Sequence, residues 1–177
     1  MWYPPKVVIP PTEPITTADV KRQCNVMHDD DDALIEAYIS AARDYVEKYT
    51  GTALAEQTVE MKCDSFADFC RLPIAPVSDV DIVYIDTAGA SQTVQDSDFE
   101  LRADGLEVSV VPAYGKQWPV QRSGSRITVT AIIGYETLPP SIGHAMLLWI
   151  AEAYLNRENA DAPQSTAFDA LLTNYRR

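Results

Sequence analysis

The residue pattern most suggestive of chemistry is a run of four contiguous aspartates, Asp29 to Asp32, directly after His28. Calcium prefers carboxylate oxygens, but an EF-hand loop spaces its ligands at alternating positions around a central glycine and ends in a glutamate. Here the carboxylates are consecutive, so their side chains point in different directions at the start of a helix. The run therefore predicts the capped, solvated beginning of a helix rather than a metal site.

Cysteine and histidine offer no second kind of site. Zinc needs about four Cys, His or carboxylate ligands at close spacing, whereas six residues separate Cys63 from Cys70 and no CxxC or HxxxH occurs. We interpret these two cysteines, and Cys24, as apolar side chains. His28 and His144 are the only histidines available for acid–base catalysis, and His144 lies beside an apolar stripe typical of a core or a subunit interface.

The sequence also lacks the motifs of common enzyme classes, because no GxSxG, P-loop or GxGxxG is present. Acidic residues are so abundant that any two would imitate a glycosidase pair. We therefore predict a chain that is not an enzyme, with no catalytic residue, no cofactor and no metal. A small hydrolase or ligand-binding module stays open as an alternative, and it would require a pocket where titratable groups converge.

Composition limits the partners of the chain. Its 177 residues carry a formal charge of −12, and the acidic residues are spread over the whole length. Stable binding of nucleic acid normally needs a basic patch, so we expect only transient contact with DNA that is not retained. The longest apolar run, 145–151, is far shorter than the roughly 18 residues that span a bilayer, which predicts no membrane partner. The odd number of cysteines, 3, and the lack of a signal-like N-terminal segment predict synthesis in the cytoplasm.

Two amphipathic helical regions bracket a β-rich middle. The first begins within 28–32 and ends before Gly51, a suitable C-terminal cap, and Tyr38 and Tyr45 recur on it at helical spacing, which is typical of a core or a subunit interface. The second opens at Pro139 and Pro140 and carries two apolar stripes. One stripe contains Ile142, Ala145, Met146, Trp149 and Ala153, and the other contains Leu147, Leu148, Ala151 and Leu155. We expect the first stripe to pack on the earlier helix, so the second needs the β insert, the C-terminal segment or another subunit.

The middle of the chain changes to the two-residue period of short strands, with turn signals between them. The predicted fold is α+β: a helical body from both ends of the chain, 16–51 and 139–177, with an inserted antiparallel β meander, 52–138. Residues 1–15 form an extended proline-rich arm whose Trp2 and Tyr3 could pack on a neighbour or on their own domain. The stretch 112–124 is predicted to be an exposed loop.

The sequence of the C-terminal region predicts a docking segment that a polar linker joins to the rest of the chain. The polar stretch 156–164 contains Pro163, which ends the preceding helix. An amphipathic segment follows, and we predict that it binds a partner. Its candidate docking residues are Phe168, Leu171, Leu172, Tyr175, Arg176 and Arg177.

Several short segments occur in an order that points to a known family. They are PPTEPITTADVK at 10–21, HDDDDALI at 28–35, YTG at 49–51, LPIAPV at 72–77, VYID at 83–86, GY at 134–135 and LPPSI at 138–142. Over nearly the whole chain this order resembles the head-tail connector (adaptor) proteins of long-tailed bacteriophages and prophages. A short helix is also predicted to begin at Thr16 or Thr17, either of which can cap it, and to end at Asn25. It carries fewer basic residues than is usual in that family.

The resemblance implies a structural virion protein, made in the host bacterial cytoplasm, that forms a ring adaptor in the neck. Such a ring docks beneath the capsid portal with the portal's twelvefold symmetry, joins it to a tail-side neck or stopper protein, and lets DNA pass. A tail-completion or stopper protein of the neck is the alternative within the same class. From packing alone, we predict that the subunit interface of the ring uses Leu147, Leu148, Ala151, Leu155, Tyr38 and Tyr45.

Overall fold

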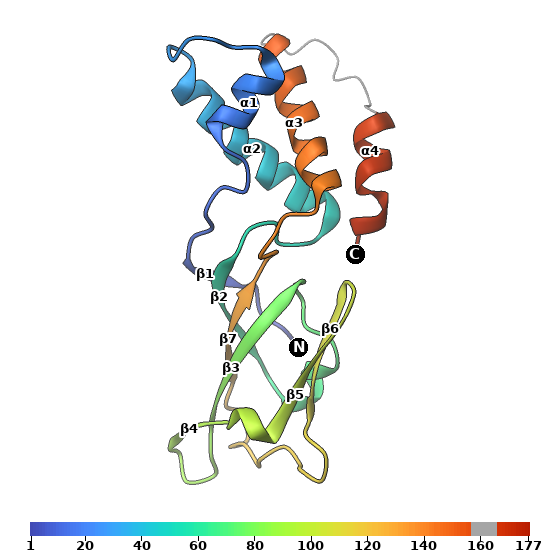
Figure 1. The fold of residues 1–177 in the computed structure, drawn as a ribbon. Coiled ribbons are helices and arrows are strands. Elements are labelled where there is room, and N and C mark those ends of the chain that lie inside the picture. The colour runs from blue at the N-terminus through green and yellow to red at the C-terminus, as the bar shows by residue number, and fades with distance from the viewer. Residues whose placement is uncertain (157–165) are drawn as a thin grey trace. The chain divides into compact units, whose positions relative to one another are not determined.

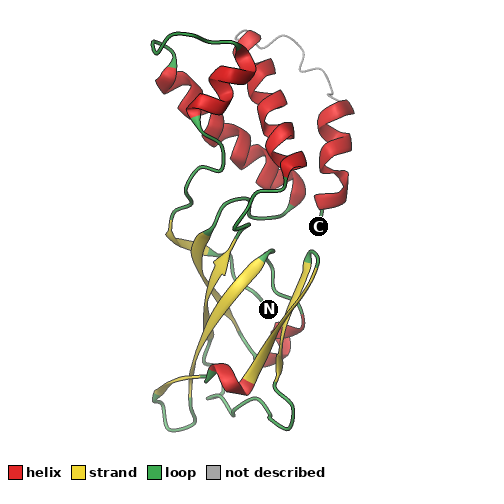
Figure 2. Ribbon diagram, in the orientation of Figure 1, coloured by secondary structure: helices red, strands yellow, loops and turns green. Residues whose placement is uncertain are grey.

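The computed structural model describes residues 1–156 and 166–177, and contacts within the chain divide it into two compact units (Figure 1). We call Thr12–Ala55 with Tyr135–Arg177 the helical unit, and Met1–Pro11 with Glu56–Gly134 the sheet unit. As predicted, the fold is α+β: helices from both ends of the chain contact each other, and antiparallel strands are inserted between them (Figure 2).

The helical unit contains α1 (Thr17–Cys24), α2 (Asp32–Thr50), α3 (Pro140–Leu155), α4 (Thr166–Leu172) and a final 3-10 turn, η3 (Thr173–Tyr175). Helix α3 contacts the other three helices. They share a core that includes Val20, Ile35, Ile39, Val46, Ile142, Met146, Ile150 and Leu172. Most of the predicted polar stretch 156–164, with Pro163, lies outside the described residues. None of the helices in the described ranges is long and apolar enough to cross a membrane.

Local signals explain where the first two helices begin and end. A capping box starts α1, because the Thr16 side chain accepts a hydrogen bond from the Asp19 backbone N–H while the Asp19 side chain accepts one from the Thr16 backbone. Helix α2 ends at Gly51, whose φ of 73° is the left-handed conformation that favours glycine. Asp31 occupies the N-cap position of α2 without a capping hydrogen bond, and its side chain accepts a hydrogen bond from the Tyr154 hydroxyl at 2.6 Å.

The sheet unit contains a five-stranded antiparallel sheet in the order β1 (Lys6–Ile9), β2 (Gln57–Cys63), β7 (Ile127–Ile133), β3 (Val77–Ile85) and β4 (Ser91–Thr93). Strands β5 (Phe99–Asp104) and β6 (Glu107–Pro112) form a separate hairpin. The strands are antiparallel as predicted, but the last strand, β7, lies between β2 and β3. Alternate residues of β2 and β7 are buried, which agrees with their two-residue period.

The predicted arm contributes the edge strand of this sheet. Strand β1 is bracketed by proline pairs and pairs with β2 through contacts such as Val7 opposite Val59. Before it, Trp2 packs on its own unit: its ring stacks on Phe69 with centroids 5.7 Å apart, and its indole N–H donates to the Asp68 carbonyl at 3.0 Å. Of the two alternatives for the arm, the structure shows the one in which it packs on its own chain.

A cluster of aromatic rings holds the long loop that precedes β7. Trp118, in the predicted loop 112–124, stacks on Phe66 at 4.8 Å and meets Phe69 edge-on at 5.3 Å. Phe66 and Phe69 belong to a 3-10 helix, η1 (Phe66–Cys70), and both are buried. Tyr114, near the start of the loop, is fully exposed at 101%. The loop is therefore anchored at Trp118 while one of its aromatic side chains stays in solvent.

Candidate interaction surfaces

The described residues contain no group of three or more His, Cys, Asp or Glu side chains arranged to hold a metal ion. Burial raises the pKa of the Cys63 thiol to about 12 and also raises the pKa of Cys24, so both stay protonated at neutral pH. His144 is exposed on α3. The predicted acidic run lies near Lys21, whose ammonium group contacts Asp29 at 2.6 Å and also pairs with Asp32.

The two apolar stripes of α3 differ in their burial. Ile142, Ala145 and Met146 of the first stripe are buried in the core of the helical unit, while Trp149 and Ala153 are half-buried. Leu147, Leu148 and Ala151 of the second stripe are only half-buried, and Leu155 at its end is 75% exposed. A single copy of the helical unit therefore leaves a row of apolar side chains incompletely covered along one face of α3.

Aromatic side chains join α2 to α3 and α4. The ring of Tyr45 stacks on Trp149 with centroids 5.9 Å apart and lies 5.5 Å from the ring of Phe168. Tyr45 is nevertheless 46% exposed, whereas Tyr38 is half-buried against the core. Both predicted interface tyrosines thus contribute to the packing of their own unit, and Tyr45 keeps a surface that a second chain can contact.

The C-terminal segment packs on its own helical unit. Phe168 is 5% exposed and Leu172 is fully buried, so these two of the predicted docking residues fill the chain's own core. Leu171 and Tyr175 are half-buried, and the Tyr175 hydroxyl forms a hydrogen bond with the Ser141 hydroxyl at 2.8 Å. The docking role of the segment stays a prediction, and the side chains that remain exposed are the ones available for it.

Polar contacts secure the end of this segment. The Tyr49 hydroxyl donates a hydrogen bond to Asp169 at 2.7 Å, and this bond is the main reason that the pKa of Tyr49 is raised. The guanidinium of Arg176 lies 5.0 Å above the Tyr49 ring, which is cation–π geometry. The backbone N–H of Arg177 donates to the Thr50 carbonyl at 2.8 Å. These contacts bring α4 and the last residues to the C-terminal end of α2.

A groove of about 340 Å³ opens between α1 and the start of α3. Its walls are mostly apolar, and they include Leu147 of the incompletely covered stripe, while Arg22 and Asp19 provide charge. The remaining lining residues are Pro14, Ile15, Gln23, Leu138, Pro139, Pro140 and Gly143. The titratable side chains among these lining residues are Arg22 and Asp19, which lie 3.7 Å apart and are 81% and 42% exposed, whereas a catalytic site requires several such groups to converge in a pocket.

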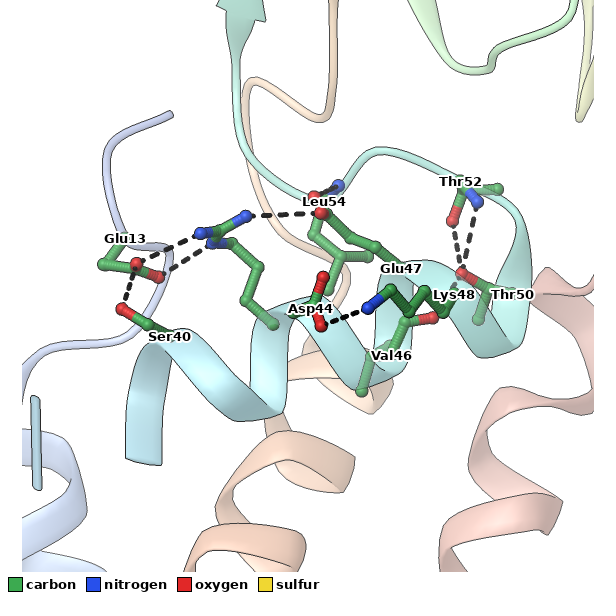
Figure 3. Close-up of polar contacts among 10 residues, drawn as sticks. Glu13, Ser40, Asp44, Val46, Glu47, Lys48, Thr50, Thr52 and Leu54 are labelled. Atoms are coloured by element: carbon green, nitrogen blue, oxygen red, sulfur yellow. Dashed lines mark hydrogen bonds and ion pairs between the residues drawn. The ribbon is translucent and has the colours of Figure 1, made fainter. Parts of the chain in front are cut away.

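A polar network fixes two connecting segments to α2 (Figure 3). The Arg43 Nε donates to Glu13 at 3.0 Å, and the Ser40 hydroxyl donates to the same carboxylate at 2.7 Å. The Arg43 Nη1 donates to Glu47 at 3.2 Å, and Glu47 in turn accepts the backbone N–H of Leu54 at 3.0 Å. Sequence analysis missed this network, because only the i,i+4 spacing of Arg43 and Glu47 signals it.

Residues 14–79 match the family described as phage gp6-like head-tail connector proteins, which confirms the resemblance expected from the sequence. No curated protein sequence matches the chain.

Solved structures share the whole fold. A chain from the neck of an empty gene transfer agent (GTA) particle, computed with C6 symmetry, has a TM-score of 0.81 and 21% identity, covering 98% of this chain and 95% of that chain. A chain from the virion of a native GTA particle has a TM-score of 0.80 and 22% identity, covering 97% and 94%. A chain from the neck of a native GTA particle, computed with C12 symmetry, has a TM-score of 0.68 and 22% identity, covering 96% and 94%.

Proposed function

We propose, because residues 14–79 match the phage gp6-like head-tail connector family, that the chain forms a ring adaptor in the neck of a phage-like particle. The family is structural, in agreement with the prediction that the chain is not an enzyme. We further propose that the ring joins the capsid portal to a tail-side neck protein.

The second stripe of α3 carries the ring proposal. It leaves Leu155 75% exposed and its neighbours half-covered within one copy. Neighbouring copies that bury this stripe against a different surface form a head-to-tail contact, and such contacts close into a ring when the rotation between copies divides a full turn. The C6 and C12 symmetries used for the GTA necks of the same fold support a ring with twelve copies.

The ring is tested by replacing Leu155 with aspartate. Because this side chain is 75% exposed, the substitution should leave the fold intact and prevent assembly on the portal protein. Val120→Asp is the matched control, since Val120 is also 75% exposed but belongs to the sheet unit. Light scattering and electron microscopy of the chain with its portal would measure assembly. Full-size rings from Leu155→Asp would contradict the role of this stripe.

We propose that the C-terminal segment, 168–177, contacts the portal through its exposed side chains. Ala170 and Asn174 are exposed and four residues apart, whereas Phe168 and Leu172 are needed in the core. Replacing Ala170 and Asn174 with arginine should weaken copurification with the portal. Ala41→Arg, at an exposed site on α2, is the control. Equal copurification of both variants would reject this docking site, and imaging the ring at the tail end of the neck would favour a stopper or tail-completion role.

DNA is proposed to pass through the ring without being held. The formal charge of −12 disfavours the phosphate neutralisation on which stable binding of DNA depends. Mixing the chain with duplex DNA at low salt should therefore give no retained complex in a gel-shift assay. A tight complex that weakens steeply as salt increases would contradict this proposal.

A further inference from the structure

The loop between α1 and α2 exposes an unusual apolar side chain. Met27 is 93% exposed, although methionine is a side chain that proteins commonly bury. Three residues further on, the side chain of Asp30 is 96% exposed and lies 3.9 Å from the Nδ1 of His28. Methionine is flexible and polarizable, so it fits irregular apolar pockets and is favoured at adaptable binding surfaces. This loop therefore presents an apolar tip with negative charge beside it.

The groove between α1 and α3 has complementary properties. Its walls are mostly apolar and include Leu147, which continues into the stripe proposed as the ring contact. At its edge, the Arg22 side chain is 81% exposed and lies 3.7 Å from Asp19, a distance typical of a weak surface pair. The groove can therefore receive an apolar side chain, and Arg22, which is more exposed than Asp19, is the group at its edge that can contact an approaching aspartate.

The tip and the groove lie on opposite flanks of the same helix. Val20 is fully buried, and successive residues of a helix are about 100° apart, so Lys21 faces one flank while Asp19 and Gln23 face the other. Asp19 and Gln23 line the groove. On the other flank, the Lys21 ammonium contacts Asp29 of the loop at 2.6 Å. Met27 is 93% exposed and is not among the residues that line the groove, so it does not occupy the groove of its own copy.

We propose that Met27 of one copy docks in the groove between α1 and α3 of the next copy, with Asp30 facing Arg22 at the groove edge. The proposal rests on the ring function proposed above, and it names the two surfaces that meet. Because they are different surfaces of one chain, the contact is head-to-tail, which is the type that closes into a ring. Charge complementarity and continuity with the α3 stripe favour a second copy as the occupant.

Replacing Met27 with aspartate tests the apolar part of the contact. Burying a methionine side chain stabilises an interface enough that its loss should raise the chain concentration needed for half-assembly on the portal by about tenfold or more. Tyr114→Asp is the matched control, because Tyr114 is fully exposed in the sheet unit. Thermal unfolding of both variants should match the original chain, which separates assembly from folding.

A charge exchange tests the pairing itself. Arg22→Glu and Asp30→Arg should each weaken assembly through like charges, and a chain carrying both should recover it, since every contact then pairs the reversed charges. Recovery is a result that simple damage to the fold would not produce. If the original chain forms rings, unchanged assembly of Met27→Asp would overturn this contact alone. Failure of the double variant to recover assembly would do the same. Failure of the original chain to form any ring would overturn the proposed function together with this contact.

Discussion

The two units of the chain expose apolar side chains in different ways. In the sheet unit these side chains lie on the edge strand β1 and in the loop around Tyr114 and Val120, while the aromatic cluster under Trp118 is closed by the unit itself. In the helical unit they are Tyr45 on α2, Leu155 on α3 and Met27 in the α1–α2 loop. The sheet unit thus exposes apolar side chains on a strand edge and a loop, whereas the helical unit exposes them on helices and on the loop between two of them.

The largest expected loss of stability comes from substitutions in the core of each unit. Phe69 is 1% exposed in the sheet unit, and Met146 is fully buried in the helical unit. Replacing Phe69 with alanine should cost about 3–5 kcal/mol, and replacing Met146 should cost about 2–5 kcal/mol, because each leaves a cavity. If the cores are separate, each variant should mainly shift the unfolding of its own unit.

Tryptophan fluorescence during urea unfolding can distinguish the units. Trp2 and Trp118 belong to the sheet unit, and Trp149 is the remaining one of the 3 tryptophans. In a Trp149→Phe background the signal reports the sheet unit alone, so Phe69→Ala should move its midpoint and Met146→Ala should not. Equal shifts from both variants would mean that the two cores unfold as one and would break the comparison.

A medium effect is expected at the polar network of the helical unit. Arg43 pairs with Glu13 and Glu47, and its side chain is only 19% exposed. Arg43→Met should cost about 1–2 kcal/mol, since it leaves two carboxylates with fewer donors in a partly buried place. Lys48→Met is the control, because its pair with Asp44 is 75% and 59% exposed and should contribute about 0.5 kcal/mol or less. Equal shifts of the urea unfolding midpoint in the two variants, relative to the original chain, would show that the network is no stronger than a surface pair.

The helices could be predicted from the sequence because their signals are local. The spacing of apolar residues, the Thr16 cap and Gly51 all act within a few residues, and the structure has α1 and α2 where these signals place them. Strand order depends on contacts between distant segments, so nothing local indicated that β7 would lie between β2 and β3. Strand β1 was missed because its four residues, bracketed by prolines, show no two-residue alternation.

The sequence indicates which segments need an apolar contact, but it does not indicate what each of them contacts. An amphipathic segment such as 168–177 reveals that it needs an apolar contact, and the sequence cannot say whether its own chain supplies it. Phe168 and Leu172 find that contact in the core of their own unit, whereas Leu155 does not. The groove beside Arg22 was also missed, because it arises from how α1 and α3 meet and has no sequence signature.

The smallest expected effect comes from carboxylates that both units use in the same way. Hydrogen bonds from the Thr16 side chain and backbone hold the pKa of Asp19 below its ordinary value of 3.8 in the helical unit. In the sheet unit, the backbone N–H of Ala90 and the Gln92 side chain do the same for Asp86. A carboxylate with a lowered folded pKa contributes stability that is fully present above about pH 4 and is lost as the pH falls through the folded value. Acid should therefore weaken both units slightly.

Thr16→Ala should remove this pH-dependent contribution to stability from the helical unit alone. The substitution deletes the oxygen that accepts the Asp19 N–H at 3.2 Å, and the loss of such a cap costs about 1 kcal/mol at neutral pH. Gln92→Ala is the counterpart in the sheet unit, where it removes a hydrogen bond of 3.0 Å to Asp86. Unfolding midpoints at pH 7 and pH 3 should differ less in each variant than in the original chain. Because neither side chain belongs to the proposed ring contact, both variants should still assemble, and loss of rings from Thr16→Ala would show that the start of α1 contributes to assembly as well as to folding.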